Sequence, residues 1–88
     1  MRITPKDLEA VCARINSVTG SPVKPYIDGV AQIGNFHLSY AYSGVALHRM
    51  ANFGGGVHAI IDGYRPKKEL YEQMHVFLSG LSFQSHSN

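Results

Sequence analysis

Three histidines in the middle of the chain are residues whose type could support metal chemistry. His37 and His48 fall on the two arms of an alternating stretch from Asn35 to Ala51, and His58 follows in the next apolar run. If the stretch is a hairpin, His37 and His48 are diagonal neighbours on one face, with Cβ atoms ~7–8 Å apart. Three such imidazoles could hold zinc, although the spacing matches no ligand signature. We favour a polar sheet surface with no metal and no cofactor.

A basic cluster could bind an anion or nucleic acid. Arg65, Lys67 and Lys68 flank Pro66, which suits the first turn of a helix. Positive side chains oppose the partial positive charge of a helix start, so three of them together point to a negatively charged ligand. A solvated helix end is the simpler interpretation, and we favour it.

Catalytic patterns are absent from the sequence. It contains no Gly-x-Ser-x-Gly, no His-Glu-x-x-His and no paired carboxylates, and Gly54-Gly55-Gly56 lacks the Lys-Ser/Thr of a P-loop. The single thiol, Cys12, falls on the apolar stripe of a predicted helix, where cysteine is usually a small, inert core residue. We therefore predict that the protein is not an enzyme.

A hairpin from Asn35 to Ala51 organises the predicted fold, with Ser43-Gly44 as its two-residue loop and Tyr42 paired with Val45. Side chains alternate across a strand, so this register defines two faces. One face is large and apolar and should pack on helices; it holds Phe36, Leu38, Tyr40, Tyr42, Val45 and Leu47. The other is small and polar and could meet water; it holds His37, Ser39, Ala41, Ala46, His48 and Met50.

Two amphipathic helices are predicted to cover the apolar face. Thr4-Pro5-Lys6-Asp7 is a favourable helix start, and Gly20 ends that helix. Its apolar stripe is Leu8, Val11, Cys12, Ile15 and Val18. Pro66 opens the second helix and Gly80 ends it. The second apolar stripe is Leu70, Met74, Phe77, Leu78 and Leu81.

The remaining apolar runs complete an antiparallel sheet. Val23–Ile27 and Val30–Ile33 flank Asp28-Gly29 and form either a tight hairpin or one bent strand. Val57–Asp62 is a further strand. The sequence thus predicts a two-layer α+β fold in the order α-β(β)-β-β-β-α, with a meander sheet and both helices on one face.

Length and composition fit one small globular domain. With 88 residues and a net charge of +2, we predict a domain over residues 1–81 and a flexible C-terminal tail over 82–88. The mild charge gives little support to nucleic-acid binding. One cysteine, no leading apolar stretch and no membrane-spanning run indicate a cytoplasmic protein. A chain of this size could gain stability as a homodimer.

The pattern from Thr4 to Leu81 resembles small accessory proteins of tailed phages and prophages. The similar segments are Gly34-Asn35-Phe36-His37-Leu, Ser43-Gly44-Val-Ala-Leu-His-Arg-Met, Gly-Gly-Gly-Val and Lys-Lys-Glu-Leu-Tyr-Glu-Gln-Met-His-Val-Phe-Leu. That family supplies no catalytic residues. The resemblance implies a protein of the host bacterial cytoplasm that binds and modulates a host protein, such as a component of host defence.

A second resemblance is to double-stranded-RNA-binding domains, which also run helix, three-stranded sheet, helix. Gly34-Asn35-Phe36-His37 and Lys67-Lys68 lie in places loosely comparable to that family's RNA-contacting loop and helix start. The proline of that loop is absent here, and the intervening strand segment is longer. This resemblance implies an alternative function, a nucleic-acid-binding module.

Our leading prediction is a non-enzymatic binding protein that acts through protein–protein contact. Tyr26, Phe53 and Tyr64 lie beside turn residues, where aromatic side chains can be exposed anchors for a partner. Nucleic-acid binding through the basic cluster is the alternative.

Overall fold

The structure is a computed structural model that describes residues 2–61 and 63–86, the last five of them as backbone only. The elements are α1 (Pro5–Thr19), β1 (Tyr26–Ile27), β2 (Val30–Ala31), β3 (Phe36–Ala41), β4 (Gly44–Met50), β5 (Val57–Ala59) and α2 (Lys67–His86). The predicted α+β class and element order are confirmed. The strands form two antiparallel sheets, β1–β2 and β3–β4–β5.

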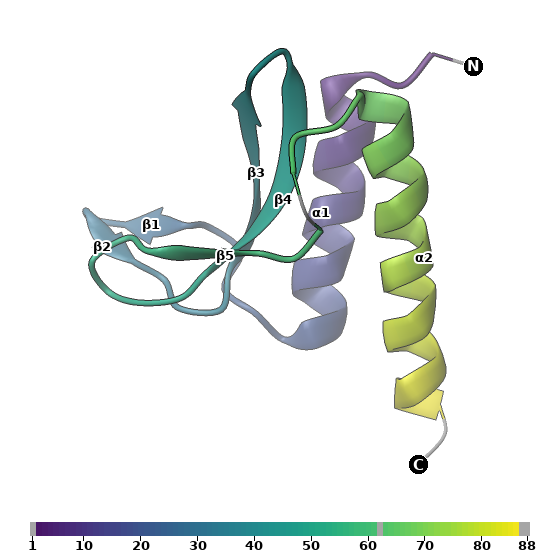
Figure 1. The fold of residues 1–88 in the computed structure, drawn as a ribbon. Helices are drawn as coiled ribbons and strands as arrows, with labels where there is room; N and C mark the ends of the chain where they lie inside the picture. Colours follow the sequence, from purple (N-terminus) through teal and green to yellow (C-terminus); the bar gives the residue numbers. More distant parts are fainter. Residues whose placement is uncertain (1, 62, 87–88) are drawn as a thin grey trace.

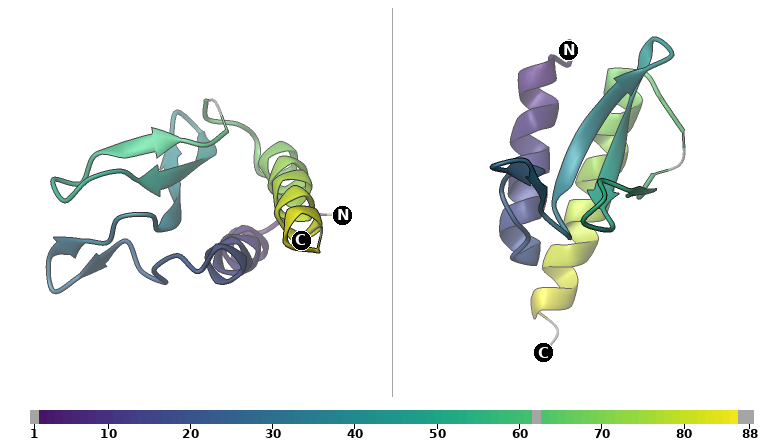
Figure 2. Two further views of the ribbon diagram at one scale, coloured as in Figure 1. Left: turned by 90° about the horizontal axis from the view of Figure 1, so that it is seen from below. Right: turned by 90° about the vertical axis from the view of Figure 1, so that its left-hand side faces the viewer.

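The helices and the sheets form two sides of the molecule. α1 and α2 lie side by side, begin at the same end and run in the same direction (Figure 1). The β3–β4 hairpin packs against them, and the other strands project away from the helices (Figure 2). We call this projection, residues 22–33 and 51–59, the arm. Neither helix in the described part of the chain combines the length and apolar character needed to cross a bilayer.

The start and end of α1 follow the predicted signals. Thr4 and Asp7 form a reciprocal capping box, and Gly20 ends the helix in the left-handed conformation with φ 69°. The predicted stripe is buried except for Val18, which is exposed. Asn16 is buried instead, because its side chain turns inward to contact β3.

The side chain of Asn16 fixes β3 against α1. Its Nδ2 donates to the Phe36 carbonyl at 2.9 Å, and the Phe36 N–H donates to its Oδ1 at 2.8 Å. Cys12 Sγ donates to the same carbonyl at 3.2 Å. Burial, with a smaller effect from Glu9, raises the pKa of Cys12 to about 11. Cys12 is therefore a packed thiol with little thiolate character.

The central hairpin turns one residue earlier than predicted. Tyr42 and Ser43 form the loop, both with positive φ (52° and 58°), as in a type I′ turn. Ala41 pairs with Gly44, so every cross-strand pair is displaced by two residues from the predicted register. A register displaced by two residues keeps each side chain on its predicted face, because side chains alternate with a period of two. Tyr42 leaves the apolar face, because it lies in the loop and is 90% exposed, and Tyr40 on that face is also exposed. On the face expected to meet water, Ala46 and Met50 are buried, so the prediction is wrong for these two residues.

Gly44 lies outside the turn, and its lack of a side chain lets the backbone of Tyr64 and Arg65 pass close to β4. A Cβ on Gly44 would lie 3.0 Å from the backbone of Tyr64 and Arg65. Arg65 and Val45 exchange two backbone hydrogen bonds of 2.9 Å at this point. The chain that enters α2 is thereby bound to the edge of β4.

Each of the two segments of the arm contains a hydrogen-bonded turn. Asp28 and Gly29, with φ 50° and 78°, close the β1–β2 hairpin, which confirms the hairpin alternative. In the loop of residues 52–56, which we call the glycine loop, Asn52 Oδ1 accepts hydrogen bonds from the N–H groups of Gly54 and Gly56 at 2.9 and 3.0 Å. The side chain of Asn52 thus holds this glycine-rich loop in place.

α2 is longer than predicted. Leu70, Met74 and Leu78 are buried, but the helix continues through Gly80 to His86, so the predicted end is wrong. Leu81, one residue beyond Gly80, still packs against the core and favours continuation. Residues 82–86 of the predicted tail have helical backbone, and residues 87–88 lie outside the described part. The predicted strand Val57–Asp62 is shorter, since β5 ends at Ala59 and Asp62 lies outside the described residues.

Candidate functional site

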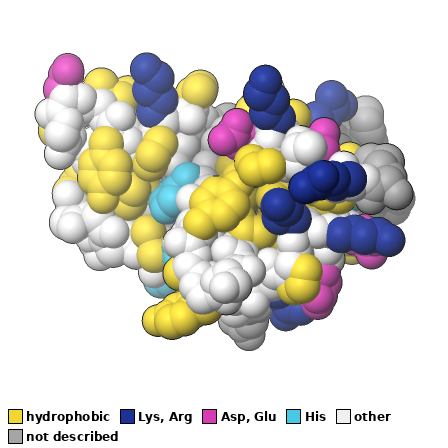
Figure 3. Space-filling model, turned by 90° about the horizontal axis from the view of Figure 1, so that it is seen from above, with side chains coloured by type: hydrophobic (Ala, Val, Ile, Leu, Met, Phe, Trp, Pro, Cys, Tyr) yellow, Lys and Arg dark blue, Asp and Glu magenta, His cyan; other side chains and the backbone are white. Residues whose placement is uncertain are grey.

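The arm presents most of the exposed large apolar side chains of the described chain. Those on the arm are Val23, Tyr26, Ile27, Val30, Ile33, Phe53 and Val57. Its two segments contain only Lys24 and Asp28 as charged residues. Figure 3 shows mostly yellow and white side chains on the arm, while dark blue Lys and Arg side chains gather where the helices begin. The arm is therefore an apolar and nearly uncharged surface.

Two of the predicted aromatic anchors lie on the arm and are exposed. Phe53 lies in the glycine loop and is 74% exposed, and Tyr26 in β1 is 50% exposed. The Tyr26 hydroxyl lies 2.7 Å from the position that a Cβ on Gly55 would occupy. The glycine therefore lets the Tyr26 ring pack against the loop that carries Phe53, which joins both anchors in one surface.

Tyr64, the third predicted anchor, lies elsewhere. Its hydroxyl shares a 2.9 Å hydrogen bond with Ser39 Oγ on the face of β3 that points away from the helices. Its ring contacts Tyr42 and His48, with centroid distances of 5.4 and 6.1 Å. Tyr64 thus covers the polar sheet face, where it is partly buried, and is not part of the arm.

The three histidines considered from the sequence as zinc ligands lie on two faces of the sheet. His37 and His48 are directly opposite each other and not diagonal, with ring centroids 6.1 Å apart. His58 pairs with Arg49, the neighbour of His48, so alternation places it on the other face of the sheet. In the described part of the chain, no three His, Cys, Asp or Glu side chains gather closely enough to hold a metal.

A buried asparagine holds His37 in place. Asn35 is fully buried, and its Nδ2 donates to the Pro22 carbonyl at 2.8 Å. Its Oδ1 lies 3.1 Å from His37 Nδ1. Burial lowers the pKa of His37 and the nearby His48 adds to the shift, while the backbone of Asn35 opposes both.

The basic cluster is divided between two environments. Arg65 Nη1 forms a 2.7 Å ion pair with Glu69 Oε1, one turn into α2. Lys67 and Lys68 are exposed at the start of α2. Of the three basic residues predicted to bind an anion, Arg65 therefore has its charge compensated by Glu69.

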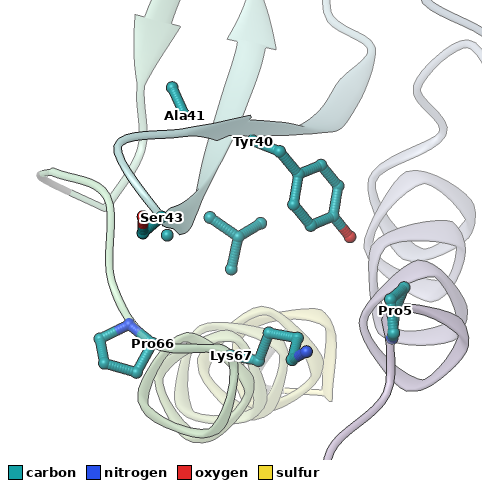
Figure 4. A pocket seen from close by; sticks show the side chains of 8 residues that line it. Pro5, Tyr40, Ala41, Ser43, Pro66 and Lys67 are labelled. Carbon is teal, nitrogen blue, oxygen red and sulfur yellow. The ribbon is translucent and has the colours of Figure 1, made fainter.

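A cleft of about 690 Å³ lies where the β3–β4 hairpin meets the starts of both helices. Figure 4 shows Tyr40 across the cleft from Lys67, with Pro5 of α1 at one side. Its lining residues are Pro5, Tyr40, Ala41, Ser43, Gly44, Val45, Pro66 and Lys67. The polar side chains of this described lining are the hydroxyl groups of Tyr40 and Ser43 and the amino group of Lys67, with no carboxylate, thiol or imidazole.

No protein-family model, curated protein or solved structure is significantly similar to this chain.

Proposed function

We propose that this chain is a non-enzymatic binding protein that contacts a partner protein through the arm. The observation that supports this function is the set of exposed apolar side chains on two adjacent, nearly uncharged hairpins. Contiguous apolar surface of this kind usually marks an interaction site. Phe53 and Tyr26 are the proposed anchors, because large aromatic side chains contribute most to binding at the centre of an interface.

The resemblance to phage accessory proteins supplies the proposed biological setting. In that setting the partner is a protein of the bacterial host, and the consequence of binding is modulation of that protein, for example a component of host defence. Binding by the arm does not depend on this biological setting, since the arm would bind an apolar protein surface in any cell.

A capture experiment tests the arm. The purified protein and its Phe53→Ser variant are incubated with nuclease-treated bacterial lysate, and retained proteins are identified by mass spectrometry. Val76→Ser is the matched control, because Val76 on α2 is 73% exposed and Phe53 is 74% exposed. We expect wild type and the Val76 variant to retain the same partner and the Phe53 variant to lose it. Equal retention by all three proteins would contradict a role of the arm.

Nucleic-acid binding is the second candidate, supported by the basic side chains where both helices begin (Figure 3). Lys67 and Lys68 project from that end, and phosphate contacts by such residues make affinity fall steeply with salt. The same capture from untreated lysate tests this function. Material that is retained there but lost after nuclease treatment, with retention reduced by Lys67→Gln, would favour nucleic-acid binding over protein binding.

A further inference from the structure

We propose that His37 and His48 form a binding site for a divalent transition-metal ion on the helix-free face of the β3–β4 hairpin, with copper(II) the preferred ion. This site adjoins the arm, since Asn35 bonds to Pro22 and His48 pairs with Ala59, but it does not depend on the function proposed above.

The spacing of the two rings fits a shared metal ion. A metal–nitrogen bond of about 2.1 Å places each imidazole centroid about 3.2 Å from the metal. Two ligating rings then have centroids about 4.5 Å apart when they bind at a right angle and about 6.4 Å apart when they bind on opposite sides of the ion, so a separation near 6 Å corresponds to nearly opposite positions. The observed separation is 6.1 Å, and the rings are tilted by 86°. Both residues belong to one directly opposed pair, so the strand register fixes their separation.

The hydrogen bonds of Asn35 select the ligating nitrogen of His37. Because the Pro22 carbonyl can only accept, the Asn35 group facing it must be the NH₂ group. Asn35 Oδ1 therefore faces His37 and accepts from Nδ1–H. The lone pair of His37 is then on Nε2, the nitrogen left for a metal. Metal-bound histidines commonly have their other nitrogen oriented by such a bond.

The ligand set defines the class of ion. Two imidazole nitrogens suit copper, nickel and zinc, whereas calcium and magnesium require oxygen ligands. Among described residues no third His, Cys, Asp or Glu completes the set. Water, or a donor atom from a partner, would fill the remaining positions. With so few protein ligands, affinity should follow the general order for divalent ions, in which copper(II) is highest.

Calorimetric titration of the full chain with copper(II) chloride near neutral pH tests the site. We expect one ion per chain, and we expect His37→Gln and His48→Gln each to weaken binding by about tenfold or more. His58→Gln is the matched control, because His58 lies on the opposite face of the same sheet. Its affinity should equal that of wild type. Circular dichroism of each variant checks the fold.

Electron paramagnetic resonance of the copper complex gives a second readout, with hyperfine coupling to two nitrogens in the wild type and to one in either variant. The proposal is overturned if copper(II) does not bind, if binding survives both the His37 and the His48 substitution, or if His58→Gln abolishes it.

Discussion

At the residue scale, two buried asparagines connect segments that are far apart in the chain. Asn16 joins α1 to β3, and Asn35 joins the Pro22 turn to His37. Both use the donor and the acceptor of the side-chain amide, as a buried polar group must. Within an apolar pattern a polar residue is usually assigned to the surface, so the sequence gives no signal for either role.

Acid should destabilise the fold through His37. Its pKa in the folded protein lies below 6.5, chiefly because of burial and then because of His48. The unfolded chain therefore takes up a proton at a pH where the folded chain does not. The free energy of unfolding should be unaffected by His37 above pH 6.5 and should fall as the pH decreases below it.

Urea denaturation near pH 7.5 and near pH 5.5 measures this difference. His37→Gln keeps a donor for Asn35 but does not titrate, so its loss of stability in acid should be smaller than that of wild type. An equal loss in both proteins would show that other groups dominate.

At the element scale, the faces of the hairpin were predictable, but its register was not. Alternation depends only on whether a residue number is odd or even, so a register displaced by two residues leaves each side chain on the face predicted for it. The register depends on the turn, and Ser43-Gly44 suggested a turn one residue too late. Gly44 is a glycine because Arg65 passes close to it, which is a long-range contact that no local pattern reveals.

Gly80 and Gly20 should respond oppositely to the same substitution. Gly80 lies inside α2 with no atom near an added Cβ, so Gly80→Ala should raise the free energy of unfolding by about 0.5–1 kcal/mol. Gly20 has φ 69° at the end of α1, and Gly20→Ala should lower it by about 1 kcal/mol. Urea denaturation of both variants and of the wild type measures these changes in the free energy of unfolding. Destabilisation by Gly80→Ala would indicate that α2 ends near Gly80.

At the scale of the whole molecule, the candidate site was predictable only in part. Proximity to turns correctly marked Tyr26 and Phe53 as exposed, but Ile27 and Val30 read as ordinary strand residues. Their exposure follows from the separation of β1–β2 from the sheet that packs on the helices. The sequence pattern shows which residues are apolar, but not which of two small sheets covers the core.

The separation of the arm predicts a gradient of local stability. β1 and β2 pair mainly with each other, whereas β3 and β4 pack on both helices. Elements with few tertiary contacts open without global unfolding. Hydrogen exchange measured by NMR should therefore show faster exchange for hydrogen-bonded amides of β1–β2 than for those of β3–β4. Equal protection in both hairpins would mean that the arm opens only with the rest of the fold.

The contact between Asn16 and Phe36 has a consequence for self-association. β3 is the outer strand of its sheet, and an outer strand offers free N–H and C=O groups that can recruit strands from other molecules. The amide of Asn16 occupies both groups of Phe36, much as one residue of a neighbouring strand would. α1 thereby blocks the beginning of this edge and limits aggregation by strand addition, in a molecule whose arm already exposes apolar side chains.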